Sequence, residues 1–314
     1  MTTKEVIFEY LKPDTTWQAL GIESQEEFIS HFFIKGKFHK NVPEIIQKDY
    51  KIAEHLLFLS YYNYALIDEA FGKLTRIFEA SINIKLADLG IEKVGFESLN
   101  SKIKRLEKYS SNELHKQWLH SKDLRNIFAH HKAGRLLGIT LFKAFPHINN
   151  MINSVFLYKN EIINKEKSLK KILAASEHLK KGHFIMDYDN KSYLIWSMIP
   201  YTSTIYDGVE KSFWVFHPVF ADKEIIEVTD FPNPFILSLK NLKINKYGLS
   251  ASIIETNETI KVAVTEINNN IDKFKIHNKK INNLSLDLRR KYWYILEDKI
   301  NEEITKFIYN HTWE

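Results

Sequence analysis

The hydrophobic pattern of the chain changes near Gly182, and this change constrains the fold more than any other feature of the sequence. Before this glycine, apolar residues recur at intervals of three and four, as in helices that bury one face. After it, short runs alternate apolar with polar residues and are rich in β-branched and aromatic side chains, as strands are. We therefore expect an α+β fold, with helices in the first part of the chain and strands in the second.

The sequence divides into three expected parts. In chain order these are a leader of short elements (residues 1–44), an antiparallel helical bundle (45–180) and a smaller β-rich domain with a C-terminal helix (181–314). Within the leader, Ser24 and Glu27 have the spacing of a capping box at the start of a helix. In the β-rich part, Asp189 and Asn190 have the composition of a hairpin turn.

Composition and missing motifs argue against several classes of protein. The chain has no cysteine, which excludes disulfides, thiolate metal sites and cysteine nucleophiles and suits a reducing cytoplasm. It has no apolar run of about 18 residues and no signal peptide, so we expect neither membrane insertion nor secretion. Phosphate-binding loops, HExxH metal motifs and serine hydrolase elbows are also absent, and we expect no cofactor and no metal.

Positive charge is concentrated between residues 101 and 150. This segment holds ten lysines and arginines but three acidic residues, whereas the rest of the chain has a small excess of negative charge. Such a local excess attracts a polyanion, and we expect Lys104, Arg105, Lys108 and Lys116 to bind RNA phosphates. The alternative is a lysine-rich helix face that only meets water.

The same basic segment contains a short motif on an expected helix. From Leu124 to His131 the sequence reads Leu-Arg-Asn-Ile-Phe-Ala-His-His. This resembles the R-x4-6-H signature of the HEPN superfamily, and its Ala-His-His ending is most similar to the Abi-like branch, which is linked to abortive infection of phage-infected bacteria. The resemblance covers about residues 45–160, and it implies that the helical bundle is of the HEPN type.

Three residues of the motif have side chains that suit RNA cleavage. Histidine titrates near neutral pH, so His130 is our candidate for the acid or base that moves a proton at the ribose 2′-hydroxyl or the leaving 5′-oxygen. The planar guanidinium of Arg125 suits the charge that develops on the phosphorane oxygens. Asn126 is one helical turn before His130, where it would orient the imidazole or bind the phosphodiester.

Helix geometry places these side chains on the expected helix. If Leu124 marks the direction of the core, an advance of about 100° per residue turns Arg125, Asn126 and His130 away from it. Two further residues are possible supports. Glu79 resembles the acidic or polar position that many HEPN proteins place on an earlier helix beside the motif, and His131 follows His130 directly.

The resemblance also implies an activity and partners. It predicts a metal-independent endoribonuclease that acts as an anti-phage abortive-infection or toxin effector, has RNA as substrate, forms a homodimer with a composite cleft, and responds to an antitoxin or a phage-derived trigger. The alternative is a HEPN module that binds RNA, a nucleotide or a protein partner without cutting. A third interpretation is a purely structural helical dimer.

Each candidate residue has a simpler alternative role. His130 and His131 would complement a helix dipole near a helix C-terminus, and Arg125 would pair with a surface carboxylate such as Asp123 or Glu113. Glu79 would pair with Arg76 of its own helix. Aromatic residues of the β-rich part are expected mainly in the core, with base stacking as the alternative: Trp196, Phe213, Trp214, Phe216 and His217.

Overall fold

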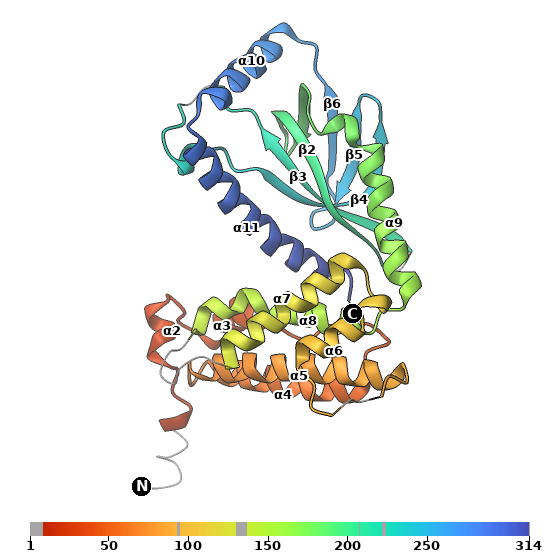
Figure 1. Ribbon diagram of the computed structural model, residues 1–314. Coiled ribbons are helices and arrows are strands. Elements are labelled where there is room, and N and C mark those ends of the chain that lie inside the picture. The colour runs from red at the N-terminus through yellow and green to blue at the C-terminus, as the bar shows by residue number, and fades with distance from the viewer. Residues whose placement is uncertain (1–8, 93–94, 130–136, 207, 222–223, 314) are drawn as a thin grey trace. The chain divides into compact units, whose positions relative to one another are not determined.

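The computed structural model describes residues 9–92, 95–129, 137–206, 208–221 and 224–313 (Figure 1). The chain forms two compact units. The first comprises Met1–Ile162 with Trp313–Glu314, and the second comprises Ile163–Thr312.

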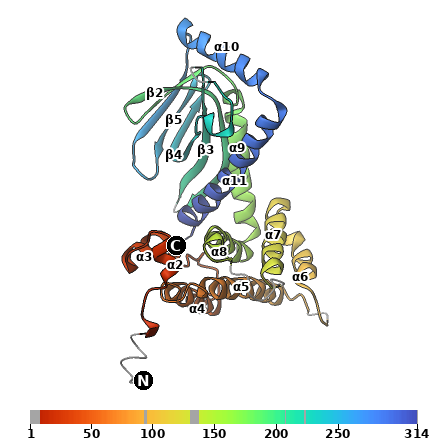
Figure 2. The same cartoon turned by 90° about the vertical axis from the view of Figure 1, so that its left-hand side faces the viewer.

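The first unit is helical. Its helices are α2 (Thr15–Ala19), α3 (Gln25–Phe32), α4 (Glu44–Leu59), α5 (Leu66–Asp88), α6 (Leu99–Arg105), α7 (Asn112–Ala129) and α8 (Ala144–Val155), with 3-10 turns η1 (Glu107–Tyr109) and η2 (Gly138–Lys143). Helix α5 is central, because α4, α6, α7 and α8 all pack against it (Figure 2). Its buried residues lie on most sides of the helix, as a central helix requires.

The first helices of the chain belong to the same core. Trp17 of α2 is fully buried, and its indole Nε1 donates a hydrogen bond to the carbonyl oxygen of Ser60 at 2.8 Å. Phe28 of α3 packs edge-on against the Trp17 ring. The N-cap expected at Ser24 is present, because the Ser24 hydroxyl accepts from the backbone N–H of Glu27. Helices α2 and α3 therefore contribute apolar surface to the core of the helical unit.

The second unit combines helices with a β-barrel. Its helices are α9 (Lys159–Ala175, which starts in the first unit), α10 (Asn268–Asn283) and α11 (Leu286–His311), with 3-10 turns η3 (Glu177–Leu179) and η4 (Val228–Asp230). Its strands are β1 (Phe184–Tyr188), β2 (Lys191–Tyr206), β3 (Val209–Pro218), β4 (Phe235–Asn245), β5 (Gly248–Ile253) and β6 (Thr259–Val264). Helices α9 and α11 lie on different sides of the barrel (Figure 1).

The six strands form a closed antiparallel barrel in the order of the sequence. The barrel closes where β1 pairs with β6, with Phe184 opposite Val264 and Met186 opposite Val262. The expected hairpin turn is present between β1 and β2, where Asp189 and Asn190 both have positive φ. Closure gives every strand a neighbour on both sides, although the far part of β2, from Ser197 to Tyr206, pairs with β3 alone.

Successive side chains of a strand point alternately into the barrel and away from it, and this divides the aromatic residues of β3 into an inner and an outer group. Trp214 and Phe216 of β3 point into the barrel core, whereas Phe213 and Val215 point outwards and pack against Leu296, Ile300 and Phe307 of α11. For Trp214, Phe216 and Phe213 the expected role in packing is confirmed. Because β3 is apolar on both faces, its outer face needs the cover that α11 provides.

The predicted fold class is wrong. The chain is a mixed helix and sheet protein whose C-terminal part is a closed six-stranded barrel with several helices, not a smaller β-rich domain with one C-terminal helix. Alternation shows that a segment is a strand but not that the first and last strands pair. Helix α10 was not predicted because it is polar and asparagine-rich, with few apolar residues, among them Phe274 and Ile281.

In the part of the chain that the structure describes, no helix is long and apolar enough to cross a membrane.

The packed core of the barrel predicts that two isoleucines of the second unit contribute very differently to the free energy of unfolding. Ile260 on β6 is fully buried inside the barrel, whereas Ile226 is 78% exposed. Ile260→Ala should lower the free energy of unfolding by about 2–5 kcal/mol because it leaves a cavity. Ile226→Ala should change it by less than about 0.5 kcal/mol. Urea unfolding followed by circular dichroism measures both, and equal effects would contradict a closed, packed barrel.

Candidate functional site

Packing against α8 fixes the orientation of α7, the helix that carries the motif. Ser111 caps the start of α7 by accepting from the backbone N–H of Leu114. One turn further on, Trp118 is buried, and its indole Nε1 donates to the hydroxyl of Ser154 on α8 at 2.8 Å. A buried tryptophan with a satisfied N–H defines the face of α7 that meets the bundle.

Arg125 follows Trp118 by seven residues, so it lies on nearly the same face two turns later. Its guanidinium accordingly reaches α5, where Nη2 lies 3.4 Å from Oε2 of Glu79. Leu124 is only partly buried against the core, and the bundle-facing direction of α7 is set by Trp118 and by the buried Ser121. The expectation that Arg125 points away from the bundle is therefore wrong.

The Glu79 carboxylate holds two cations from two different helices. Its Oε1 lies 3.1 Å from the ammonium of Lys102 on α6, and its Oε2 meets Arg125 on α7. Among the described residues no ion pair joins Glu79 to Arg76 of its own helix, which was the simpler alternative. A carboxylate on a central helix needs such partners, because burial without them costs several kcal/mol.

Exposure differs within this cluster. The Lys102 side chain is 12% exposed, the Glu79 side chain 24% and the Arg125 side chain 35%. The largely buried Lys102 ammonium thus binds mainly the Glu79 carboxylate, whereas part of the Arg125 guanidinium contacts solvent. A partly exposed arginine held by a carboxylate keeps donors for a phosphate while its position is restricted.

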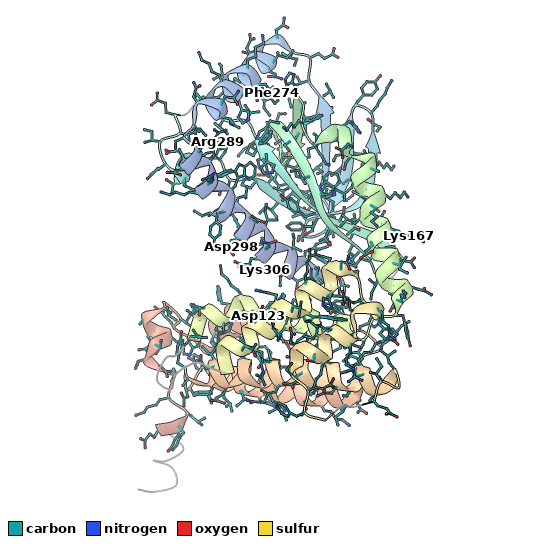
Figure 3. The ribbon with its side chains drawn as sticks, in the orientation of Figure 1. Asp123, Lys167, Phe274, Arg289, Asp298 and Lys306 are labelled. Carbon is teal, nitrogen blue, oxygen red and sulfur yellow. The ribbon has the colours of Figure 1, made fainter. Side chains whose placement is uncertain are left out.

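Asn126 contacts the arginine beside it. Its side-chain oxygen accepts from Nη1 of Arg125 at 3.4 Å, so within the described structure it orients the guanidinium. The predictions on His130 and His131 fall outside the described residues. Of the alternative surface partners for Arg125, Asp123 pairs instead with Lys122 at 2.9 Å, and Figure 3 shows Asp123 on α7.

A pair of histidines between α7 and α8 was missed from the sequence. The rings of His120 and His147 meet edge to face with centroids 5.4 Å apart, and Nε2 of His147 lies 2.9 Å from the buried Ser121 hydroxyl. Burial, with a smaller contribution from His120, lowers the pKa of His147 to about 4. His147 is therefore neutral at pH 7 and joins the two helices. No spacing in the sequence pairs these residues.

The expected RNA-binding residues fall into two groups. Lys104, Lys108 and Lys116 are exposed, and Lys108 lies over the ring of Tyr109. Arg105 instead forms a 2.6 Å ion pair with Glu97. The acidic partners of Lys102 and Arg105 lie before residue 101, so counting charges between 101 and 150 overstates the positive charge that this surface presents.

A cavity of about 660 Å³ opens beside the cluster, at the end of α5 and along α6. Lys102, Arg105, Glu92 and Glu97 line it together with apolar residues of α5. Its mixed charges do not select for an anion. Within the described ranges, no group of three or more histidine, aspartate or glutamate side chains is placed to hold a metal ion.

Comparison with family models, with curated proteins and with solved structures finds no match for this chain.

The exposed lysines give a prediction on salt dependence. Lys104→Gln combined with Lys116→Gln should weaken RNA binding and flatten the dependence of log K on log salt by about 0.7 for each lost phosphate contact. The matched control is Lys48→Gln with Lys51→Gln, which removes two charges from the exposed side of α4. Fluorescence anisotropy with a labelled RNA measures both slopes. Equal losses in the two double variants would show that only net charge matters.

Proposed function

We propose that the chain is a metal-independent endoribonuclease of the HEPN type, with Arg125, Asn126 and His130 as its catalytic residues. The proposal places it in the cytoplasm, where it would act as an abortive-infection or toxin effector under the control of an antitoxin or a phage-derived trigger. RNA is the substrate, and two copies of the chain would form the cleft.

The ion pair between Arg125 and Glu79 is the observation that carries the proposal. Glu79 was singled out from the sequence as the residue of an earlier helix that would lie beside the motif, and its carboxylate contacts Arg125 at 3.4 Å. The ion pair restricts the guanidinium while the Arg125 side chain stays 35% exposed, so the arginine can still bind a phosphate. Glu79 is thus a positioning residue for the guanidinium.

The proposed reaction needs only groups of the RNA and of this chain. The ribose 2′-oxygen attacks the adjacent phosphorus as its proton leaves, and the bond from phosphorus to the 5′-oxygen breaks as that oxygen gains a proton. His130 moves a proton in one of these steps, and Arg125 binds the negative charge on the phosphorane oxygens. DNA lacks the attacking hydroxyl, so the reaction is selective for RNA.

A non-cleaving module is the competing function, and it shares the arginine. In that case Arg125 binds the phosphodiester but His130 transfers no proton. Cleavage itself distinguishes the two, since both predict RNA binding.

The first prediction from this proposal concerns single substitutions in the motif. His130→Ala and Arg125→Ala should each lower the rate of RNA cleavage by about 10²- to 10⁴-fold, because one removes the proton-transfer group and the other the charge-stabilising donor. Chelation with EDTA should leave the rate unchanged. The rate at which the purified protein cleaves a fluorescent RNA measures the effects of both substitutions and of EDTA.

Matched controls are His55→Ala on α4 and Arg76→Ala on α5, both exposed residues of the same unit. They should cleave at the wild-type rate. Two outcomes would contradict the proposed mechanism. One is a folded His130→Ala variant that cleaves as fast as the wild type, and the other is activity that disappears with EDTA and returns with magnesium.

The second prediction is a homodimer whose interface includes the segment from Asn112 to His131. One motif supplies a single catalytic histidine and encloses the phosphodiester poorly, whereas two symmetry-related motifs form a cleft. Sedimentation velocity at micromolar concentration measures the assembly. A monomer that cleaves RNA at full rate would refute the composite cleft.

A further inference from the structure

A second cavity, of about 760 Å³, lies in the barrel unit between the outer face of the barrel and helices α10 and α11. This volume is within the range of sites that bind small molecules. Six aromatic residues form much of its wall: Trp196, Phe220, Phe231, Phe274, Tyr292 and Trp293. Figure 3 shows two lining residues, Phe274 on α10 and Arg289 at the start of α11.

Strand alternation places two of the lining residues on the outside of the barrel. Trp214 and Phe216 point into the barrel core, so His217, the next residue of β3, points outwards into the cavity. On β2 the register shifts between Ile195 and Ser197, and Trp196 at this irregularity also faces the cavity. We expected Trp196 and His217 to pack in the core. Both residues also line this cavity, which the sequence did not predict.

One buried histidine, His217, lines the cavity, and a second, His277, packs against Trp196 and Phe220 of the cavity wall without lining it. His217 and His277 are almost fully buried, and the rings of both lie 5.4 Å from the ring of Trp196. The Nε2 atom of each has no hydrogen-bond partner among the described residues. Burial lowers the pKa of both histidines to about 4, so both are neutral at pH 7.

The tautomer of His277 follows from its other nitrogen. The backbone N–H of Phe220 donates to Nδ1 of His277 at 3.3 Å, so Nε2 carries the proton and is an unused donor. A buried donor without an acceptor costs about 1–3 kcal/mol. Of these two histidines only His217 lines the cavity, and its Nε2 is likewise unsatisfied, so a purely apolar ligand would leave that cost in place, whereas a heteroaromatic ligand brings hydrogen-bonding atoms as well as a flat ring.

The charged side chains that line the cavity are all basic. They are Lys180, Lys181 and Arg289, and no aspartate or glutamate lines the described part of the cavity. Lys180 is paired with Glu177, but the Nε atom of Arg289 is buried without a partner in the described structure. A ligand that satisfies these groups carries a negative charge.

We propose that this cavity binds a nucleotide, with the base among the aromatic side chains and His217 and the phosphate at Arg289 and Lys181. A nucleotide combines the three properties that the cavity selects: a flat ring, heteroatoms that form hydrogen bonds, and an anionic group. Two sources supply this chemistry, a free nucleotide and the terminal nucleotide of an RNA. The site is independent of the motif on α7.

Isothermal titration calorimetry of the full chain with AMP and with GMP tests the proposal. Adenosine, ribose 5-phosphate and inorganic phosphate are the partial ligands, and at least one nucleotide should bind about tenfold or more tightly than any of them. A short RNA titrated into the His130→Ala variant, with and without Arg289→Gln, identifies the source: RNA affinity that exceeds that of the free nucleotide and falls with Arg289→Gln points to an RNA end, and RNA affinity that does not depend on Arg289 points to a free nucleotide.

Variants of adjacent arginines provide the matched comparison. Arg289→Gln should weaken nucleotide binding about tenfold or more, whereas Arg290→Gln, at an exposed neighbouring position, should leave it unchanged. Trp293 is 43% exposed, so Trp293→Ala should fold and should also weaken binding.

Three results would overturn the proposal. They are no binding of either nucleotide at about 1 mM, equally tight binding of phosphate alone, and equal affinities of the folded Arg289 and Arg290 variants. If Arg289→Gln does not fold, wild-type affinity of Trp293→Ala would overturn it.

Discussion

Strand β3 has apolar or aromatic side chains on both faces, and the second unit is organised around that constraint. Its inward residues fill a barrel that closes through the pairing of β1 with β6. Its outward residues Phe213 and Val215 need a second cover, which α11 supplies with Leu296, Ile300 and Phe307. The same cover, extended by α10, encloses the aromatic cavity beside His217, so the cavity is a consequence of how the barrel is covered.

The helical unit depends on a comparable constraint at one carboxylate. Glu79 lies on the central helix α5, where an ionised side chain needs partners, and it receives Lys102 from α6 and Arg125 from α7. Three helices are thereby joined at one polar point, and the hydrogen bond from Trp118 to Ser154 separately joins α7 to α8. The arginine with the sequence context of a catalytic residue is the more exposed of the two cations.

Patterns among neighbouring residues correctly predicted caps and turns. They could not predict features that depend on contacts between segments far apart in the sequence. The Ser24 cap and the turn at Asp189 and Asn190 follow from neighbouring residues, and both are present. Closure of the barrel is set by strands far apart in the sequence, and α10 has too few apolar residues to show a helical period. The orientation of Arg125 was missed because Leu124 suggested the core direction, whereas the pairing of Trp118 with Ser154 determines it.

The chemical identity of the RNA ends tests the central claim, cleavage by attack of the ribose 2′-hydroxyl, most directly. Purified chain is incubated with a short RNA, and the products are analysed by mass spectrometry, with the folded His130→Ala variant alongside. We predict a 2′,3′-cyclic phosphate, or the 3′-phosphate formed by its hydrolysis, on one product and a 5′-hydroxyl on the other. Products with a 3′-hydroxyl and a 5′-phosphate, which require water as the attacking group, would contradict the claim.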